Sequence, residues 1–362
     1  ILGSNLRVGE RRIWLGLGLL GGLDELRYQP EGADQVAPDG AIGLVYNALI
    51  RHLQGEHEVV EFSFDWRRPI EEEARRLGAE VQAALDARRE SGQPVRLLVH
   101  SMGGVVARTM QLECPAIWQR LMSHPQARLV MLGTPNGGSW APMQVLSGDD
   151  SFGNALAAVG APFKDQAARQ LMASMPGFIQ LQAGLTDPQL ALDQEETWRN
   201  LARRDLAQLR ERSWWHRNWM GETDRDDQLA VYEWGVPPQA VLDQARALRV
   251  RLDEQRRSAL PGFADKMALV VGRSKFTPDG FEWREDEGFV YLNAVDGGDG
   301  RVPLKDALLP GVRTWTLDSE HGSLPSAKSA FDAFNELLVS GETDRLPRLA
   351  GTRGAPGTAG AA

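Results

Sequence analysis

A serine at the tip of a glycine-rich turn is the first candidate for chemistry in this sequence. Ser101 follows an apolar run at residues 95–99, which is typical of a buried parallel strand, and a helical segment begins at Val105. A strand that turns sharply into a helix at a serine is the layout of a nucleophile elbow. The turn exposes the hydroxyl, and the helix N-terminus offers backbone N–H groups and a positive dipole end to an oxyanion. We therefore predict that Ser101 is a nucleophile.

The motif around Ser101 is incomplete. The usual pattern is Gly-x-Ser-x-Gly, and Val99 stands at the position of the first glycine. Gly103 and Gly104 supply the small residues that let the helix approach the strand closely. An ordinary strand–loop–helix connection is therefore an alternative. A nucleophilic serine also needs a base and a group that orients the base, so these partners must decide between the two interpretations.

The base for Ser101 must come from six histidines. His321 lies directly after the last strand candidate and before the last helix, which fits the chain order of serine, acid and histidine expected with such an elbow. His52 and His57 precede the nucleophile, and His100 adjoins it and projects elsewhere. His124 follows the helix after Ser101, and His216 lies in a helical block. We therefore predict His321 as the base, and a surface-loop histidine is the alternative.

The acid should come from a loop between Ser101 and His321. A glycine-rich stretch at residues 296–303 contains Asp296 and Asp299, and glycines let such a loop fold tightly so that a short carboxylate can point inward. We choose Asp299 over Asp296 because Gly300 and an extended segment follow it. The stretch alone would suit an ordinary turn or a calcium loop, but the ligand ladder of a calcium loop is missing. No metal or cofactor is predicted.

Strand-like and helix-like segments alternate in the first 139 residues and again near the end of the chain. This alternation argues for an α/β fold with a mainly parallel sheet flanked by helices. Strand candidates lie at residues 58–64, 95–99, 128–135, 267–271, 289–292 and 312–317, and the chain begins with the end of a further strand at residues 1–6. An amphipathic helix at residues 70–89 carries acids in its first turn, as the helix dipole prefers.

Residues 140–264 break this alternation, because helix-like segments dominate and no convincing strand is present. A helical block between sheet strands is most simply a cap over the carboxyl edge of the strands, where open α/β sheets carry their sites. A separate helical domain that binds a partner is the alternative. Three tryptophans of this block either line a lid that faces lipid or pack in an ordinary way; they are Trp214, Trp215 and Trp219.

The predicted organisation therefore has four parts. A core begins at residues 1–139 and is completed by residues 265–349, with the cap at 140–264 between them and a flexible linker at 350–362. Both ends of the sequence look like cuts, so further domains of the same polypeptide are expected.

Composition excludes several classes of protein. A net charge of −9 gives no electrostatic reason to expect a nucleic-acid partner. The single cysteine, Cys114, excludes an internal disulfide framework. Within the sequence, no apolar run reaches the roughly 18 residues that a membrane helix needs, and no signal peptide is visible. A cytoplasmic location is therefore slightly favoured.

With these pieces placed, the chain resembles the lecithin:cholesterol acyltransferase-like family of α/β-hydrolases, particularly its bacterial lipase-like and esterase-like members. Six motifs occur in the family's order: the opening loop at residues 1–6, Phe-Asp-Trp-Arg at 64–67, His-Ser-Met-Gly-Gly at 100–104, Leu-Gly-Thr-Pro at 132–135, Gly-Asp-Gly-Arg-Val-Pro at 298–303, and His321. The resemblance implies an α/β-hydrolase fold.

The resemblance also implies site residues. The triad would be Ser101, Asp299 and His321, and the oxyanion hole would use the backbone N–H groups of Met102 and Ile1. Two positions depart from the family pattern. Val99 replaces a small residue, and Arg301 stands where the family has Thr or Ser; we expect both to affect local packing more than chemistry.

The predicted function is acyl transfer from a carboxylic ester, with lipid esters as the expected substrates, through an acyl-serine intermediate. Attack by water would make the protein an esterase, lipase or phospholipase, and attack by an alcohol would make it an acyltransferase. Transient contact of the cap with a lipid surface is expected. A catalytically inactive binding or scaffolding module and a serine peptidase on the same fold are the alternatives.

Overall fold

The computed structural model describes residues 3–13, 23–149, 165–220, 233–285 and 287–350. A parallel sheet lies at its centre, with the strand order β4–β5–β6–β9. Its strands are β4 (Arg96–His100), β5 (Arg128–Leu132), β6 (Met267–Val271) and β9 (Arg313–Thr316). All four were predicted as strands, and the predicted α/β class, with a parallel sheet between helices, is confirmed.

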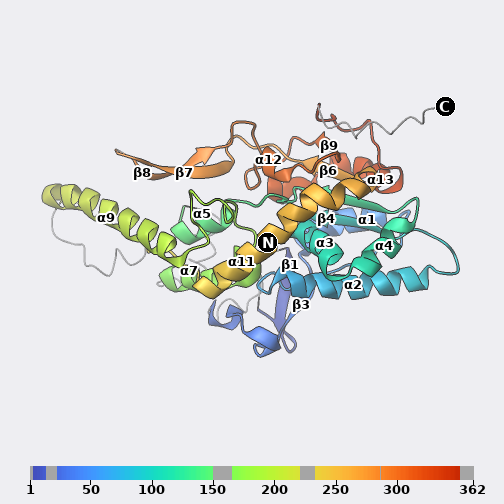
Figure 1. Cartoon of the computed structure of the whole chain (residues 1–362), viewed down its shortest axis with the longest axis horizontal. Helices are drawn as coiled ribbons and strands as arrows, with labels where there is room; N and C mark the ends of the chain where they lie inside the picture. The colour runs from blue at the N-terminus through green and yellow to red at the C-terminus, as the bar shows by residue number, and fades with distance from the viewer. Residues whose placement is uncertain (1–2, 14–22, 150–164, 221–232, 286, 351–362) are drawn as a thin grey trace.

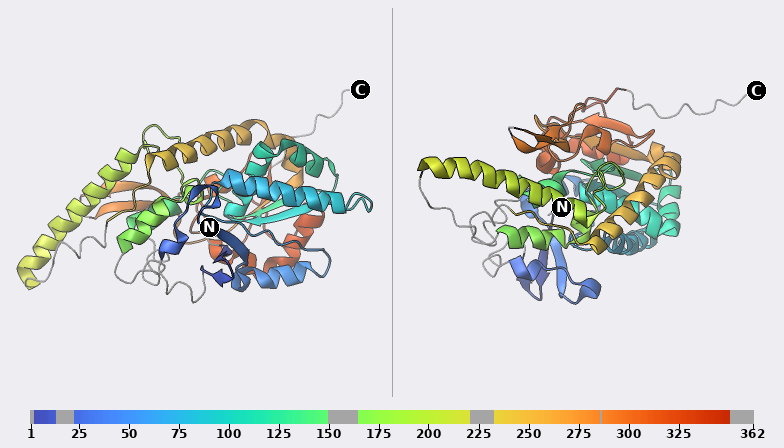
Figure 2. Two further views of the ribbon diagram at one scale, coloured as in Figure 1. Left: turned by 90° about the horizontal axis from the view of Figure 1, so that it is seen from below. Right: turned by 60° about the vertical axis from the view of Figure 1, so that its left-hand side comes forward.

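Each face of the parallel sheet packs against helices (Figures 1 and 2). Along β5, Leu129 and Met131 join one hydrophobic cluster, whereas Val130 and Leu132 join another, as alternating side chains of a strand must. The first cluster includes α2 (Ile70–Ala87), α3 (Met102–Glu113) and α4 (Pro115–Ser123). The second includes α1 (Gly43–Leu53) and α13 (Phe331–Val339). Helices on both faces explain why β5 and β6 are almost continuously apolar.

A small antiparallel sheet with the order β2–β1–β3 holds the opening segment of the chain. It consists of β1 (Ser4–Val8), β2 (Arg11–Arg12) and β3 (Val36–Ala41). The short helices η2 (Leu23–Leu26) and η3 (Pro30–Gly32) lie between β2 and β3 in the chain. The prediction of a strand at residues 58–64 is wrong. The segment is not part of a strand ladder; Phe64 N donates to the Ser4 side chain and Ser63 Oγ accepts from Gly40 N.

The strand predicted at residues 289–292 forms, but it does not join the parallel sheet. It belongs to an antiparallel hairpin of β7 (Pro278–Arg284) and β8 (Gly288–Asn293). Its aromatic side chains pack on one another, with Phe289 in contact with Phe281, Trp283, Tyr291 and Trp234. Figure 1 shows the hairpin extending beyond the sheet beside the long helix α9 (Glu195–Met220).

The described part of residues 140–264 is built from helices and turns. In addition to α9 it contains α5 (Ala141–Ser147), α7 (Asp165–Ala173), α8 (Pro176–Ile179), α11 (Gln239–Ser258) and the start of η5 (Leu260–Lys266). Residues of α5, α8 and α11 belong to the same hydrophobic cluster as α3, so they pack directly on the core. The start of α9 also contributes Trp198 to this cluster, and the rest of the helix projects from the molecule in both views of Figure 2. The four-part organisation stays a prediction.

The remaining short helices follow the strands near the end of the chain: α12 (Leu304–Ala307), η6 (His321–Ser326) and η7 (Lys328–Ala330). The side chains of Trp214, Trp215 and Trp219 and the linker from residue 351 onward lie outside the described part. Within the described ranges, no helix is both long enough and apolar enough to span a bilayer.

Candidate active site

Ser101 is the single residue between β4, which ends at His100, and α3, which begins at Met102. Its backbone angles are φ 53° and ψ −127°, a conformation that residues other than glycine rarely adopt. The turn is held by a hydrogen bond of 2.9 Å from Ser101 N to Leu132 O on the neighbouring strand. The predicted strand–serine–helix arrangement therefore includes a strained backbone at the serine, as a nucleophile elbow requires.

Small residues after Ser101 let α3 lie close to the sheet. A Cβ atom at Gly104 would overlap the side chain of Thr134, which follows β5. A Cβ atom at Gly103 would lie 3.8 Å from Val99 Cβ, an ordinary contact distance. Val99 therefore fits beside Gly103 without crowding the elbow, and the missing first glycine of the motif has no steric consequence there.

The three side chains predicted to form the triad lie within hydrogen-bond distance in the predicted order. His321 Nε2 is 2.8 Å from Ser101 Oγ, and His321 Nδ1 is 2.7 Å from Asp299 Oδ2. The alternative acid, Asp296, is exposed to solvent. The structure thus brings Ser101, His321 and Asp299 together and leaves Asp296 outside the hydrogen-bonded chain.

Asp299 is suited to orient a histidine because it stays ionised although it is buried. Burial by itself raises the pKa of Asp299, but the charge of His321 and its hydrogen bond act in the opposite direction. The backbone N–H groups of Val302 and Arg301 also donate to Asp299 Oδ1, at 2.8 and 3.0 Å. Together these interactions lower the pKa of Asp299 below its usual value. The carboxylate therefore accepts a hydrogen bond from the protonated Nδ1 of His321. This leaves Nε2 of His321 without a hydrogen and able to take the proton of Ser101.

Two glycines at the carboxyl ends of neighbouring strands make room for the acid and the histidine. Gly133 follows β5 with φ +54°, and a Cβ atom there would lie 2.9 Å from Asp299 Oδ2 and 3.2 Å from His321 Nδ1. Gly272 follows β6, and its Cβ atom would lie 2.8 Å from Asp299 Cβ. The sequence contained Gly133 only as part of a family motif. A glycine directly after a buried strand is the signal that could have indicated its role.

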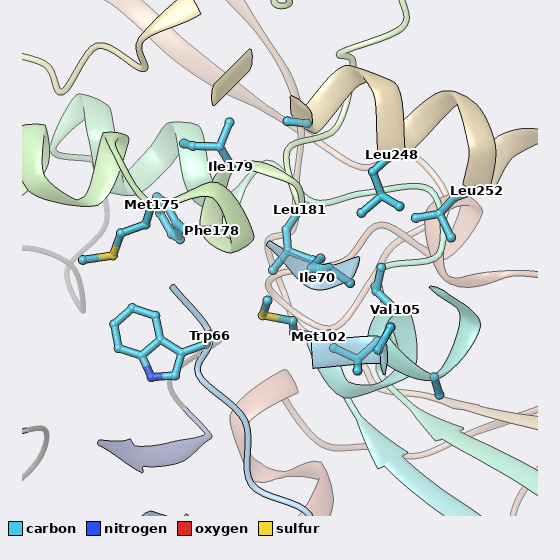
Figure 3. Packing of buried hydrophobic residues seen from close by; sticks show 14 of the residues in the cluster. Trp66, Ile70, Met102, Val105, Met175, Phe178, Ile179, Leu181, Leu248 and Leu252 are labelled. Carbon is cyan, nitrogen blue, oxygen red and sulfur yellow. The ribbon is translucent and has the colours of Figure 1, made fainter. Parts of the chain in front are cut away.

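Met102, predicted as an oxyanion-hole donor, is the first residue of α3, so its N–H has no acceptor within the helix. Its side chain is fully buried and lies among Trp66, Ile70 and the residues of α8 (Figure 3). A Cβ atom at Gly177 in α8 would lie 3.1 Å from Met102 Cε. The side chain of Met102, directly after Ser101, is therefore packed against α8. The other predicted donor, Ile1, lies outside the described residues.

The Phe-Asp-Trp-Arg motif at residues 64–67 lies beside the side chain of Met102 (Figure 3). The buried guanidinium of Arg67 donates from Nε to Asp65 Oδ1 at 2.9 Å and from Nη2 to Asp65 Oδ2 at 2.6 Å, and Asp34 lies 3.0 Å from Nη2. Arg67 O accepts a hydrogen bond from Gly177 N. The motif thus joins the opening part of the chain to α8, and it contributes no group to the triad.

His100, which the sequence reasoning set aside as a partner for Ser101, contacts His321 by another route. Its Nε2 lies 3.0 Å from the backbone oxygen of His321, and its Nδ1 lies 2.9 Å from Tyr46 Oη. Neither His100 nor Tyr46 was predicted as a site residue. Contacts between residues so far apart in the chain leave no local pattern in the sequence.

Comparison with known proteins matches part of the chain to a family model. The family model described as "Lecithin:cholesterol acyltransferase" matches residues 43–180, which include Ser101 and the strands β4 and β5 of the parallel sheet. Over these residues the chain is similar to the lecithin:cholesterol acyltransferase family. The match confirms the predicted resemblance over residues 43–180, and at the level of the family it supports a hydrolase of the esterase or acyltransferase type.

The chain is similar to solved structures at low identity, and one of them shares its fold. A chain in the crystal structure of the Tle4–Tli4 complex is 14% identical, with 93% of this chain and 96% of that chain covered and a TM-score of 0.52. Two structures of the Bacillus licheniformis lipase BlEst2 also match, both with a TM-score of 0.34. The mature form is 15% identical, with 75% of each chain covered. The propeptide form is 18% identical, and this chain covers 41% of its length. The search of curated proteins gives no match.

Proposed function

We propose that this α/β-hydrolase cleaves carboxylic esters of lipids through an acyl-serine intermediate. The observation that carries the proposal is the continuous hydrogen-bonded chain from Ser101 through His321 to Asp299. The strained backbone of Ser101 and the N-terminus of α3 beside it support the same function. The family match supports an ester bond as the target.

In the first half of the proposed reaction, Ser101 Oγ attacks the ester carbonyl carbon while His321 Nε2 removes the hydroxyl proton. The carbonyl oxygen becomes an oxyanion, and the N–H of Met102, at the start of α3, donates to it in the proposed reaction. His321 then gives the proton to the leaving alcohol, and the acyl group stays on Ser101. Asp299 holds the Nδ1–H of His321 throughout and stabilises the imidazolium.

In the second half, a water molecule attacks the acyl carbon and His321 accepts its proton. The carboxylic acid leaves, and Ser101 regains its hydrogen from His321. An alcohol in place of water would give acyl transfer, and the name of the matching family supports this second candidate. We favour hydrolysis because water is always available to the site. The expected contact of residues 140–264 with a lipid surface and the cytoplasmic location stay predictions.

The proposal is tested with a fluorophosphonate probe, which reacts covalently with activated serines. We expect the wild type to be labelled once per chain. The label should be lost in Ser101→Ala and kept in Ser123→Ala, a matched change at an exposed serine at the end of α4. Absence of labelling in the folded wild type would sink the enzyme proposal in favour of an inactive binding module.

The substrate is tested separately. Purified protein is incubated with vesicles of phospholipid or emulsions of acylglycerol, with and without an added alcohol, and the products are identified by mass spectrometry. Free fatty acid supports hydrolysis, and a new ester supports transfer. Peptide amides serve as the control, and their faster cleavage would support the peptidase alternative.

A further inference from the structure

A second hydrogen-bonded chain runs behind the triad and ends on the backbone of its histidine. Tyr46, on α1, lies with its hydroxyl 2.9 Å from His100 Nδ1, and His100 Nε2 lies 3.0 Å from the backbone oxygen of His321. The rings of His100 and His321 are 5.1 Å apart between their centroids. The chain joins a helix, the end of strand β4 and the loop that carries His321.

The directions of these hydrogen bonds follow from the chemistry of the acceptor. A backbone carbonyl oxygen can only accept, so Nε2 of His100 carries the hydrogen. In the neutral ring Nδ1 is then an acceptor, and the hydroxyl of Tyr46 donates to it. Burial, followed by the charge of His321, lowers the pKa of His100 to about 3, so the neutral ring persists at ordinary pH. His100 therefore holds one defined tautomer beside the nucleophile.

His321 is anchored through both of its backbone polar groups. Its N–H donates to Asp299 O at 2.8 Å, and its carbonyl oxygen accepts from His100 Nε2. These bonds fix the main chain of His321 to the acid loop on one side and to the neighbour of Ser101 on the other. Only the side-chain torsions then remain to place Nε2 against Ser101 Oγ and Nδ1 against Asp299 Oδ2.

Tyr46 also contacts the opening segment of the chain. A Cβ atom at Gly3 would lie 2.9 Å from Tyr46 Oη, and Gly3 O accepts a hydrogen bond from Ile42 N directly before α1. Tyr46 thus lies where the opening segment, the elbow strand and the His321 loop meet. Loss of its hydroxyl would remove one donor at this junction without changing the shape of the aromatic ring.

We propose that Tyr46 and His100 are positioning residues that hold the main chain of His321 in register with Ser101 and Asp299. The proposal rests on the proposed function, because the register matters for proton transfer between Ser101 and His321. Among the described residues, neither side chain is hydrogen-bonded to Ser101 Oγ or to the imidazole of His321. Their contribution should appear in the rate of the chemical step and not in substrate binding.

The kinetic test compares Tyr46→Phe, His100→Leu and His100→Gln on a water-soluble p-nitrophenyl ester, at a temperature where each variant is folded by circular dichroism. We expect kcat to fall about 10- to 100-fold in Tyr46→Phe and His100→Leu, with KM within about twofold. His100→Gln keeps an N–H donor for the carbonyl of His321, so it should retain several times the kcat of His100→Leu. Wild-type kcat in folded Tyr46→Phe and His100→Leu would overturn the proposal.

Two matched controls separate positioning from a general loss of packing. Tyr28→Phe removes a hydroxyl from a partly buried tyrosine beside Arg68 and Glu72, and His57→Gln alters a histidine bonded at 2.6 Å to Asn335 on α13. Both should leave kcat within about twofold of the wild type. Equal losses in the controls and in the test variants would contradict a specific role for Tyr46 and His100.

A spectroscopic measurement keeps this inference distinct from the proposed function. The hydrogen-bonded Nδ1 proton between His321 and Asp299 should give a downfield proton resonance, which requires no turnover. We expect this resonance in the wild type and its broadening or shift in Tyr46→Phe. An unchanged resonance in Tyr46→Phe contradicts the positioning role even in a protein that hydrolyses no ester. Absent activity with a changed resonance would refute only the proposed function.

Discussion

Asp299 and His321 are joined by two hydrogen bonds, one between side chains and one between backbone groups. Asp299 Oδ2 lies 2.7 Å from His321 Nδ1, and Asp299 O accepts from His321 N at 2.8 Å. The double connection means that the acid loop and the histidine loop cannot shift independently. The ring of His321 is therefore oriented by a neighbour that also fixes its main chain.

The first prediction concerns the charge of Asp299. In Asp299→Asn the amide can donate to Nδ1 of His321, which favours the tautomer that has its hydrogen on Nε2 and cannot accept the proton of Ser101. We expect kcat on a p-nitrophenyl ester to fall about 10³- to 10⁴-fold with little change in the melting temperature. The control is Asp296→Asn, at an exposed position of the same loop. A larger loss in Asp296→Asn than in Asp299→Asn would show that the acid is assigned to the wrong residue.

The second prediction concerns the space beside the acid. Gly133→Ala would place a methyl group against Asp299 Oδ2 and His321 Nδ1, and it would put alanine at φ +54°. We expect kcat to fall about 100-fold, since displacement of reacting groups by about 1 Å has effects of that size. Gly9→Ala is a matched control, because Gly9 has φ +55° and a Cβ atom there would meet nothing within 4 Å. Both variants should lose stability, but only Gly133→Ala should lose kcat; equal activity in the two would contradict the steric argument.

The three residues that the sequence singles out lie within hydrogen-bond distance of one another, and each could be recognised because chain order and turn chemistry are local signals. The strand before Ser101, the glycines around Asp299 and the position of His321 after the last strand could each be recognised separately. The contacts that hold these three residues in place could not be recognised from the sequence. Tyr46 lies 54 residues before His100, and His100 lies 221 residues before the carbonyl that it binds.

The errors in the fold have a related cause. Residues 58–64 have the composition of a strand, and Phe64 packs on the core, but a ladder also needs a partner strand in register. Residues 289–292 form a strand whose partner is β7 and not the parallel sheet. Alternation of apolar residues indicates which side chains are buried. It does not identify the neighbouring strand.

The third prediction concerns the buried ion pair of the Phe-Asp-Trp-Arg motif. Arg67→Met would remove the fully buried cation that Asp65 and Asp34 share, and would leave them only the longer contacts to Arg68, at 3.3 and 3.6 Å. We expect a loss of about 3–5 kcal/mol in the free energy of unfolding, measured with urea. Arg75→Met is the control, because Arg75 is about half exposed where it pairs with Glu113, and it should cost less than about 1 kcal/mol. Equal losses would mean that Arg67 contributes no more than a surface charge.

Glu73, on α2, provides a prediction about pH. Its side chain is buried, and among the described residues Oε1 has no hydrogen-bond partner, whereas Oε2 pairs with Arg76. Burial raises the pKa of Glu73 to about 7, although the charge and hydrogen bond of Arg76 oppose the shift. Asp65 also raises it and Arg68 lowers it. The folded protein therefore binds a proton at Glu73 at a pH where the unfolded chain, with a pKa near the ordinary value of 4.5, has released it.

The raised pKa of Glu73 makes the stability of the fold depend on pH. Between about pH 4.5 and pH 7 the folded state holds more protons at Glu73 than the unfolded state, so stability falls as pH rises through this window. Above it, the ionised side chain costs the fold roughly 3 kcal/mol, since each pKa unit corresponds to about 1.4 kcal/mol. Glu73→Gln keeps a neutral side chain of similar shape, so we expect it to be more stable than the wild type at pH 8 and nearly equal at pH 4.5. Urea unfolding at the two pH values measures this difference, with the exposed Glu90→Gln as the control. A gain in stability that is the same at both pH values would show that titration of Glu73 is not its cause.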